Sequence, residues 1–274
     1  MALPASFQFS QASLQDYTDC PRRFQLRYLE RVVWPAVEAE PALENERYAR
    51  QGVAFHRLVH QHALGVPIAR LSQTVVDPDL RRWWRNYLEA GPADLPAARY
   101  PEVVLSAPLA GHRLVAKMDL VAVDPGQQAV VVDWKTSRRR TERQQLARRW
   151  QTRLYTYLLV CAGHHLNDGR SLLPQQVAMV YWFADFPADP ERFVYTVEQY
   201  RQDEADLAAL IGEIERLGGS DFPLTAQERH CCYCPYRSLC RRGVEAGESA
   251  RWEQDEGMDD LAFDLEQVAE IAYE

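Results

Sequence analysis

Two aspartates and a lysine lie on the two strands of a predicted strand–turn–strand segment. Asp119 lies in an apolar run over residues 114–123, and Asp133-Trp134-Lys135 ends a second run that begins at residue 129. The Asp-Pro-Gly-Gln sequence between them is typical of a turn. A hairpin would bring Asp119 and Asp133 to one end of a sheet, where paired carboxylates can hold a hard divalent cation. With Lys135 on the same strand face, these groups could cleave a phosphodiester, because the metal activates water and the cation stabilises the pentacovalent phosphate.

Lysine is rare in this chain, which strengthens that interpretation. Of 31 basic residues only Lys117 and Lys135 are lysines, and the other 29 are arginines. An ammonium group is compact and its pKa can be tuned, and neither is true of a guanidinium. Taken alone, Asp-x-Lys is weak evidence and favours a surface strand that ends in ordinary polar residues.

Other side chains could complete such a site. His56 is a candidate metal ligand on a predicted helix, although His60 lies one turn later on the same face. Glu102 is either a further acidic ligand or a solvent-facing strand end. Gln151 and Tyr155 share a helix face and could bind phosphate or orient a catalytic group, or simply lie on the surface of an amphipathic helix.

Four cysteines have the spacing of a metal site. Cys231, Cys234 and Cys240 supply three thiols near the C-terminus, and Cys20 is a distant fourth, with Cys232 as the spare. Four thiolates suit a zinc ion or an iron–sulfur cluster, but paired Cys-x2-Cys halves, which zinc sites usually show, are missing. Such a centre would join the two ends of the fold.

Length and composition suggest a cytoplasmic protein. The 274 residues can form one large domain or two small ones, and no apolar stretch approaches the ~18 residues of a membrane span. Residues 1–10 carry no secretory signal pattern. Six cysteines in a reducing compartment favour metal binding over disulfides.

Charge is distributed unevenly. Residues 245–274 hold eleven acidic residues against Arg251, a net charge of −10, so residues 1–244 sum to +2 against the total of −8. A basic stretch follows Lys135 and suits a polyanion, or is a solvated helix face: Arg138, Arg139, Arg140, Arg143, Arg148, Arg149 and Arg153. We therefore expect a domain over 1–244 and an acidic tail over 245–274. The tail either docks on a protein partner, covers the basic surface, or is disordered.

The hydrophobic pattern predicts alternating helices and strands. A helix begins after Ser10 and breaks near Cys20, and residues 35–45 form a loop. Further helices are predicted over 48–64, 77–90, 142–162 and 200–217, and strands over 102–109, 112–123, 128–135, 177–183 and 193–197. No glycine-rich phosphate-binding loop is present, so an ATPase motor of that type is excluded.

Together these motifs resemble the RecB-like branch of the PD-(D/E)XK nucleases, over most of residues 8–242. The similarity is to its iron–sulfur members, the CRISPR-associated RecB-like exonucleases and the nuclease domain of AddB. The matching segments, in chain order, are Ser13-x3-Tyr17-x2-Cys20-Pro21-x2-Phe24, His56, Asp119, Asp133-Trp134-Lys135, Gln151-x3-Tyr155, and Cys231, Cys234 and Cys240. Asp133 stands where many relatives have glutamate, and the acidic tail has no counterpart in the family pattern.

The resemblance implies a restriction-endonuclease-like α/β core, with a mixed central sheet flanked by helices, and Mg²⁺- or Mn²⁺-dependent cleavage of DNA. It implies that His56, Asp119, Asp133 and the Trp134 carbonyl bind the metal, and that Lys135 acts on water or the transition state. Cys20, Cys231, Cys234 and Cys240 would bind a structural [4Fe–4S] cluster. We expect an exonuclease acting on single strands or DNA ends in repair, recombination or CRISPR adaptation. The alternative is a catalytically quiet DNA-binding subunit.

Overall fold

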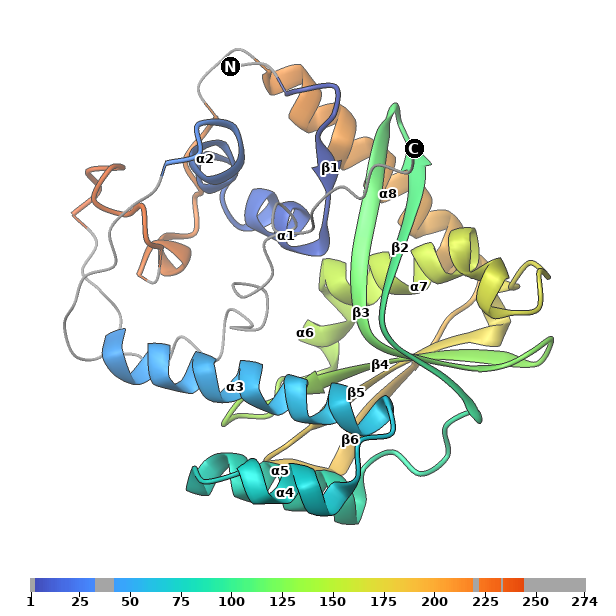
Figure 1. The fold of residues 1–274 in the computed structure, drawn as a ribbon. Coiled ribbons are helices and arrows are strands. Elements are labelled where there is room, and N and C mark those ends of the chain that lie inside the picture. Colours follow the sequence, from blue (N-terminus) through green and yellow to red (C-terminus); the bar gives the residue numbers. More distant parts are fainter. Residues whose placement is uncertain (1–2, 33–41, 219–221, 233, 244–274) are drawn as a thin grey trace, which may run out of the picture.

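The computed structural model describes residues 3–32, 42–218, 222–232 and 234–243. A mixed six-stranded sheet lies at the centre of this part, with helices on both faces (Figure 1). The strands are β1 (Gln8–Phe9), β2 (Ala98–Leu109), β3 (His112–Asp124), β4 (Gln128–Lys135), β5 (Val177–Phe183) and β6 (Phe186–Val194). The α-helices are α1 (Gln11–Asp19), α2 (Pro21–Phe24), α3 (Ala42–Ala63), α4 (Ile68–Thr74), α5 (Pro78–Ala90), α6 (Arg143–Arg148), α7 (Trp150–Ala162) and α8 (Val197–Leu217). A π-helical turn (Gln25–Leu29) and three 3-10 turns (Gly163–Leu166, Pro174–Gln176 and Glu228–Cys231) complete the chain.

Strand β3 organises the sheet. It pairs antiparallel with β2 along one edge, and on the other edge with β1 near its start and with β4 near its end. β4 pairs parallel with β5 through a crossover that contains α6 and α7, and β5 pairs antiparallel with β6. The predicted α/β class with a mixed central sheet flanked by helices is therefore confirmed.

The central strands are apolar without interruption because both faces of the sheet are covered. In β4, Val130 and Val132 pack with α3, α4 and α5, whereas Ala129 and Val131 pack with α7 and α8. All four side chains are fully buried, as is almost all of β5. Figure 1 shows α3, α4 and α5 on one face and α7 and α8 on the other.

The predicted long helix over 142–162 breaks at Arg149, whose backbone is extended. Two contacts account for the break. The Trp150 indole N–H donates to Thr18 Oγ1 of α1 at 2.7 Å, and the Thr152 hydroxyl donates to the Leu146 carbonyl at 2.5 Å. The second bond satisfies a carbonyl that the interrupted helix leaves without its usual partner. As a result α7 starts afresh at Trp150, with Gln151 in its first turn.

Other boundaries differ more modestly. Helix α3 begins at Ala42, inside the predicted loop 35–45, whose residues 35–41 lie outside the described part. Strand β2 begins at Ala98 instead of 102, and α4 was not predicted. The last strand is β6, not 193–197, and it carries Pro187 and Pro190, which an edge strand tolerates.

The C-terminal described segment lies against α1 and α2 (Figure 1). Arg22 N–H donates to the Pro223 carbonyl at 3.2 Å, Phe222 N–H donates to Gln25 Oε1 at 3.0 Å, and His230 Nδ1 is 3.0 Å from the Asp19 carbonyl. These bonds join the two ends of the predicted domain 1–244. The predicted acidic tail lies outside the described residues. Among the described helices, none has the length and apolar character that a membrane crossing requires.

A buried ion pair fastens α7 to α8, and its loss should destabilise the fold. Arg153 Nε is 2.6 Å from Asp203 Oδ1, and Asp203 is fully buried. Arg153→Ala leaves that carboxylate without its cation, so we expect the free energy of unfolding to fall by about 3 kcal/mol in urea titrations. Arg201→Ala, at an exposed position of α8, is the control and should change it by less than about 0.5 kcal/mol. Equal stability of both variants would contradict the assignment.

Candidate active site

Asp119 and Asp133 lie at the end of the ladder between β3 and β4. The last paired residues are Leu120 and Val132, and the aspartates are the next positions outward in the same register. The Trp134 backbone N–H donates to Asp119 Oδ2 at 3.0 Å. The hairpin thus places one aspartate on each strand of its open end and fixes the first by a main-chain bond.

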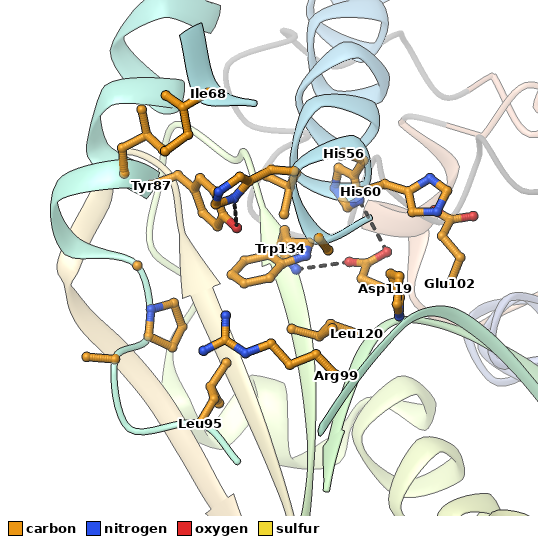
Figure 2. A pocket seen from close by; sticks show the side chains of 18 of the residues that line it. His56, His60, Ile68, Tyr87, Leu95, Arg99, Glu102, Asp119, Leu120 and Trp134 are labelled. Atoms are coloured by element: carbon orange, nitrogen blue, oxygen red, sulfur yellow. Dashed lines mark hydrogen bonds and ion pairs between the residues drawn. The ribbon is translucent and has the colours of Figure 1, made fainter. Parts of the chain in front are cut away.

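Helix α3 brings His56 to Asp119. Its Nδ1 is 3.2 Å from Asp119 Oδ1, and Figure 2 shows the two side chains pointing toward each other. Phe55, which is fully buried against Trp182 at a ring distance of 6.1 Å, seats the helix on the sheet. His60 lines the same pocket one turn later. The contact with Asp119 therefore distinguishes His56 from His60, which spacing alone could not.

Ionised Asp119 is favoured in this setting. Burial raises the pKa of Asp119, but the His56 imidazole, the Trp134 N–H and the Lys135 ammonium together lower it below the ordinary value. The carboxylate is therefore charged at neutral pH and can act as a ligand or acceptor.

Asp133 and Lys135 form a buried ion pair on the α7 side of the sheet. Lys135 Nζ is 3.0 Å from Asp133 Oδ2, and each residue is only 3% exposed. Gln151 Nε2 donates to the other carboxylate oxygen at 2.7 Å. The first turn of α7 therefore orients Asp133, which places Gln151 with the candidate site.

Tyr181 belongs to this cluster, although its local sequence carries no signal of a functional role. Its hydroxyl donates to Gln151 Oε1 at 3.3 Å, and its ring lies 5.7 Å from Lys135 Nζ. Burial and the neighbouring Asp133 raise the pKa of Tyr181 well above its ordinary value, so the phenol stays protonated and keeps donating. In the parallel ladder Tyr181 is the partner of Asp133. Only the β4–β5 register, which the sequence does not reveal, could have identified it.

Two of the predicted residues, Tyr155 and Trp134, have side chains that pack in the hydrophobic core. Tyr155 is buried in the core between the sheet and α7. The Trp134 ring packs in the opposite core, edge-on to Tyr87 at 5.5 Å and to Trp182 at 5.9 Å. The backbone of Trp134, not its ring, meets Asp119.

Glu102 does not begin its strand but lies within β2. It stands opposite Asp119, between the paired residues Pro101 and Val103. Its φ of +56° is in the left-handed region, which costs a non-glycine residue of order 1 kcal/mol. The carboxylate forms an ion pair with Lys117 and lines the pocket beside Asp119. Both lysines of the chain thus lie near Asp119.

The four predicted thiols gather in one neighbourhood, where α2 meets the C-terminal segment. Cys20, Cys231 and Cys234 are buried, and all six cysteines of the chain, every one of them described, are free of disulfides. Burial, together with the neighbouring thiols of Cys20 and Cys240, raises the pKa of Cys234 to about 12. Cys20 and Cys231 act in the same way on the pKa of Cys240.

Cys232 is separate from these four. It is half-buried, and its Sγ lies 3.8 Å from the Glu228 carbonyl. Cys231 is instead buried, and the Arg242 guanidinium donates to its Sγ at 3.8 Å. The structure therefore groups Cys231, and not Cys232, with Cys20, Cys234 and Cys240.

Among the described residues, neither the carboxylates with His56 nor the four thiols surround a position where a metal ion could bind. Within the described ranges, no three His, Cys, Asp or Glu side chains are arranged to hold a metal ion together. The predicted [4Fe–4S] cluster is thus not supported by the geometry. The donor types do fit: carboxylates and an imidazole suit Mg²⁺ or Mn²⁺, and four neighbouring thiols suit iron or zinc.

The basic stretch is only partly available to a ligand. Arg140 and Arg143 both pair with Glu191, and Arg153 pairs with Asp203. By contrast, Arg148 and Arg149 line a pocket of about 510 Å³ that also reaches Gln151. Three of the seven arginines of the basic stretch therefore form internal ion pairs.

The lowered pKa of Asp119 predicts a pH effect on stability. An aspartate whose folded-state pKa lies below its unfolded value of ~3.9 adds stability above that pH, which is lost as the pH falls through the folded pKa. In urea unfolding at pH 7 and pH 3, we expect the stability difference between wild type and Asp119→Asn to shrink at the lower pH. Asp124→Asn, at the exposed turn of the same hairpin, is the control. An unchanged difference for Asp119→Asn would contradict the assignment.

Two solved structures are similar to this chain. A protein from Eubacterium rectale named "Putative exonuclease" superposes with a TM-score of 0.50 at 11% identity, covering 88% of this chain and 91% of its own. The crystal structure of SSO0001 gives a TM-score of 0.42 at 14% identity, covering 85% of each chain. No curated protein matches the sequence.

The sequence model of one family covers almost the whole described fold. The model of the PD-(D/E)XK nuclease superfamily matches residues 8–241, from β1 to the last of the neighbouring thiols. Since this match takes in well over half of the chain, the protein belongs to the PD-(D/E)XK nuclease superfamily.

Proposed function

We propose that the protein is a divalent-metal-dependent deoxyribonuclease that acts as an exonuclease on single strands or free DNA ends. The observation that carries the proposal is the assembly of His56, Asp119, Asp133 and Lys135 at one end of the β3–β4 ladder, in a chain of nuclease ancestry. The name of the E. rectale protein, which shares the fold, also favours the exonuclease mode.

His56, Asp119, Asp133 and the Trp134 carbonyl are the residues that would hold Mg²⁺ or Mn²⁺. When bound, such an ion lowers the pKa of a water molecule and polarises the scissile phosphate. Asp119 enters this role already ionised, and the Trp134 N–H keeps one of its oxygens oriented. Gln151 does the same for Asp133 from the opposite face.

Lys135 supplies the positive charge for the reaction. Its ammonium is buried beside Asp133 and rests over the Tyr181 ring, so few conformations are open to it. A preorganised cation in a site screened from water stabilises charge that develops on a phosphate oxygen far better than one in solution. Its second task is to orient the attacking water through the same ammonium protons.

The pocket that reaches Gln151 is a candidate path for the strand. Arg148 and Arg149 offer charge, and Gln11 and Gln15 of α1 offer hydrogen bonds to backbone phosphates. Because Gln151 contacts Asp133, a strand in this pocket would run directly to the site.

Cleavage of end-labelled single-stranded DNA tests the activity. With Mn²⁺ or Mg²⁺ we expect the wild type to degrade it, and Lys135→Ala to lose at least ~100-fold in rate, since a preorganised charge is removed. The position of the label identifies the polarity.

Two histidine variants sharpen the same assay. His56→Ala should require far more Mn²⁺ for half-maximal rate, whereas His60→Ala, one turn further on the same helix, should not. Intact cleavage by His56→Ala would remove that ligand from the proposal. A folded wild type that binds DNA without cutting it would instead favour the catalytically quiet subunit.

We further propose that Cys20, Cys231, Cys234 and Cys240 hold a structural [4Fe–4S] cluster, with zinc as the alternative. Four thiols lie together without disulfides, and Arg22, Arg23 and Arg242 surround them with positive charge that favours thiolates. Metal binding requires these groups as thiolates and displaces their protons. The centre would reinforce the contacts that already join the two ends of the fold.

Optical spectra of protein purified without oxygen test this centre. A cluster gives brown protein with broad absorption near ~400 nm, and zinc gives colourless protein. We expect Cys231→Ser to lose the metal and Cys232→Ser, its direct neighbour, to retain it. Retention of the metal by Cys231→Ser with loss by Cys232→Ser would reverse the ligand assignment.

Two further expectations from the sequence remain predictions. They are the docking of a partner on the acidic tail 245–274 and a cytoplasmic location.

A further inference from the structure

The pocket beside Asp119 is larger than a metal site requires. Its volume is about 480 Å³, and α3, α4, α5 and the strands β2, β3 and β4 all contribute to its lining (Figure 2). His56 and Asp119 occupy one part of it, whereas Ile68, Leu95 and Leu120 line the rest. A volume of this size, in which apolar walls adjoin polar side chains, is characteristic of sites that hold a whole small ligand.

Aromatic rings held in place line this pocket. Tyr87 and Trp134 both line it, with ring centres 5.5 Å apart and nearly perpendicular. His62 Nδ1, 3.0 Å from the Tyr87 hydroxyl, restrains the phenol, and Trp84 stacks on its ring at 5.4 Å. Trp134 is only 3% exposed, so the half-buried Tyr87 ring is the one of the two that a nucleobase can reach, and an aromatic ring binds nucleobases without preference for a particular base.

The pocket also contains one arginine, beside the carboxylates of Glu89, Glu102 and Asp119. Arg99 is the only arginine or lysine among its lining residues, and Figure 2 shows its side chain between Leu95 and Trp134. Within the described ranges, no carboxylate forms an ion pair with Arg99, whereas Glu102 is already paired with Lys117. A guanidinium in this state suits the planar, bidentate recognition of a phosphate.

The neighbouring imidazoles do not compete with Arg99 for that role. Burial, together with the charge of Lys117, lowers the pKa of His60, and burial together with Arg99 lowers that of His62. Both rings are therefore neutral at pH 7 and contribute hydrogen bonds, not charge. A phosphate entering the pocket would find its positive partner in Arg99.

We propose that this pocket binds the terminal nucleotide of the DNA strand, with the base against Tyr87 and its phosphate on Arg99. The proposal rests on the proposed nuclease function and deepens it. Because Asp119 lines the same pocket, the bond to the terminal nucleotide would lie at the candidate metal site. The enzyme would then cleave one nucleotide at a time from the strand end and release mononucleotides.

Isothermal titration of the full-length protein with thymidine 5′-monophosphate, thymidine 3′-monophosphate and thymidine tests this site. We expect a monophosphate to bind the wild type, and Arg99→Ala to weaken it about tenfold or more while leaving thymidine binding unchanged. Arg113→Ala is the matched control, because Arg113 is an exposed strand arginine that donates to Ser106 Oγ away from the pocket. The isomer that binds more tightly identifies the strand end that enters.

The titration needs neither metal nor turnover, so its failure can be told apart from that of the nuclease assignment. Metal-dependent cleavage by a wild type that binds neither monophosphate overturns the end-nucleotide site alone. Equal monophosphate affinity of Arg99→Ala and wild type does the same. Arg99-dependent binding in a protein that does not cut DNA supports the nucleotide site and overturns the nuclease function.

Discussion

The candidate site depends on the register between β3 and β4. Asp119 and Asp133 are the first positions beyond the ladder on their two strands because the ladder ends at Leu120 and Val132, and the Trp134 N–H then bonds the Asp119 carboxylate. A slip of one residue would turn every side chain of β4 to the other face and separate this set. The buried valines that hold the register are therefore as necessary to the site as its charged residues.

The sheet separates two groups of supporting residues, and the site lies where they meet. Along β4 the side chains alternate, so Asp133 and Lys135 face α7 and Tyr181 while Trp134 faces α5. Helix α3 brings His56 from one layer, and α7 brings Gln151 from the other. Each aspartate is thus held by a different layer, and neither layer alone can orient both.

The sequence predicted local features well and long-range contacts poorly. The hairpin, β4 and β5 could be derived because Asp-Pro-Gly and uninterrupted apolar runs act over a few residues. The break at Arg149 depends on the contact of Trp150 with Thr18, and Tyr181 depends on the β4–β5 register, so neither leaves a local signal. For the same reason the choice between His56 and His60 needed the position of Asp119, and the partners of Arg140, Arg143 and Arg153 were not foreseen.

The scarcity of lysine gives the protein a chemical property of its own. Apart from the terminal amino group, only Lys117 and Lys135 carry primary amines, and both lie near Asp119. Their exposures differ, since the Lys117 side chain is 27% exposed and that of Lys135 is 4% exposed. An acylating reagent specific for amines should therefore react with Lys117 in preference to Lys135, because only Lys117 is accessible. A fluorophore or spin label introduced in this way would report on the entrance to the site, without the background that most proteins present.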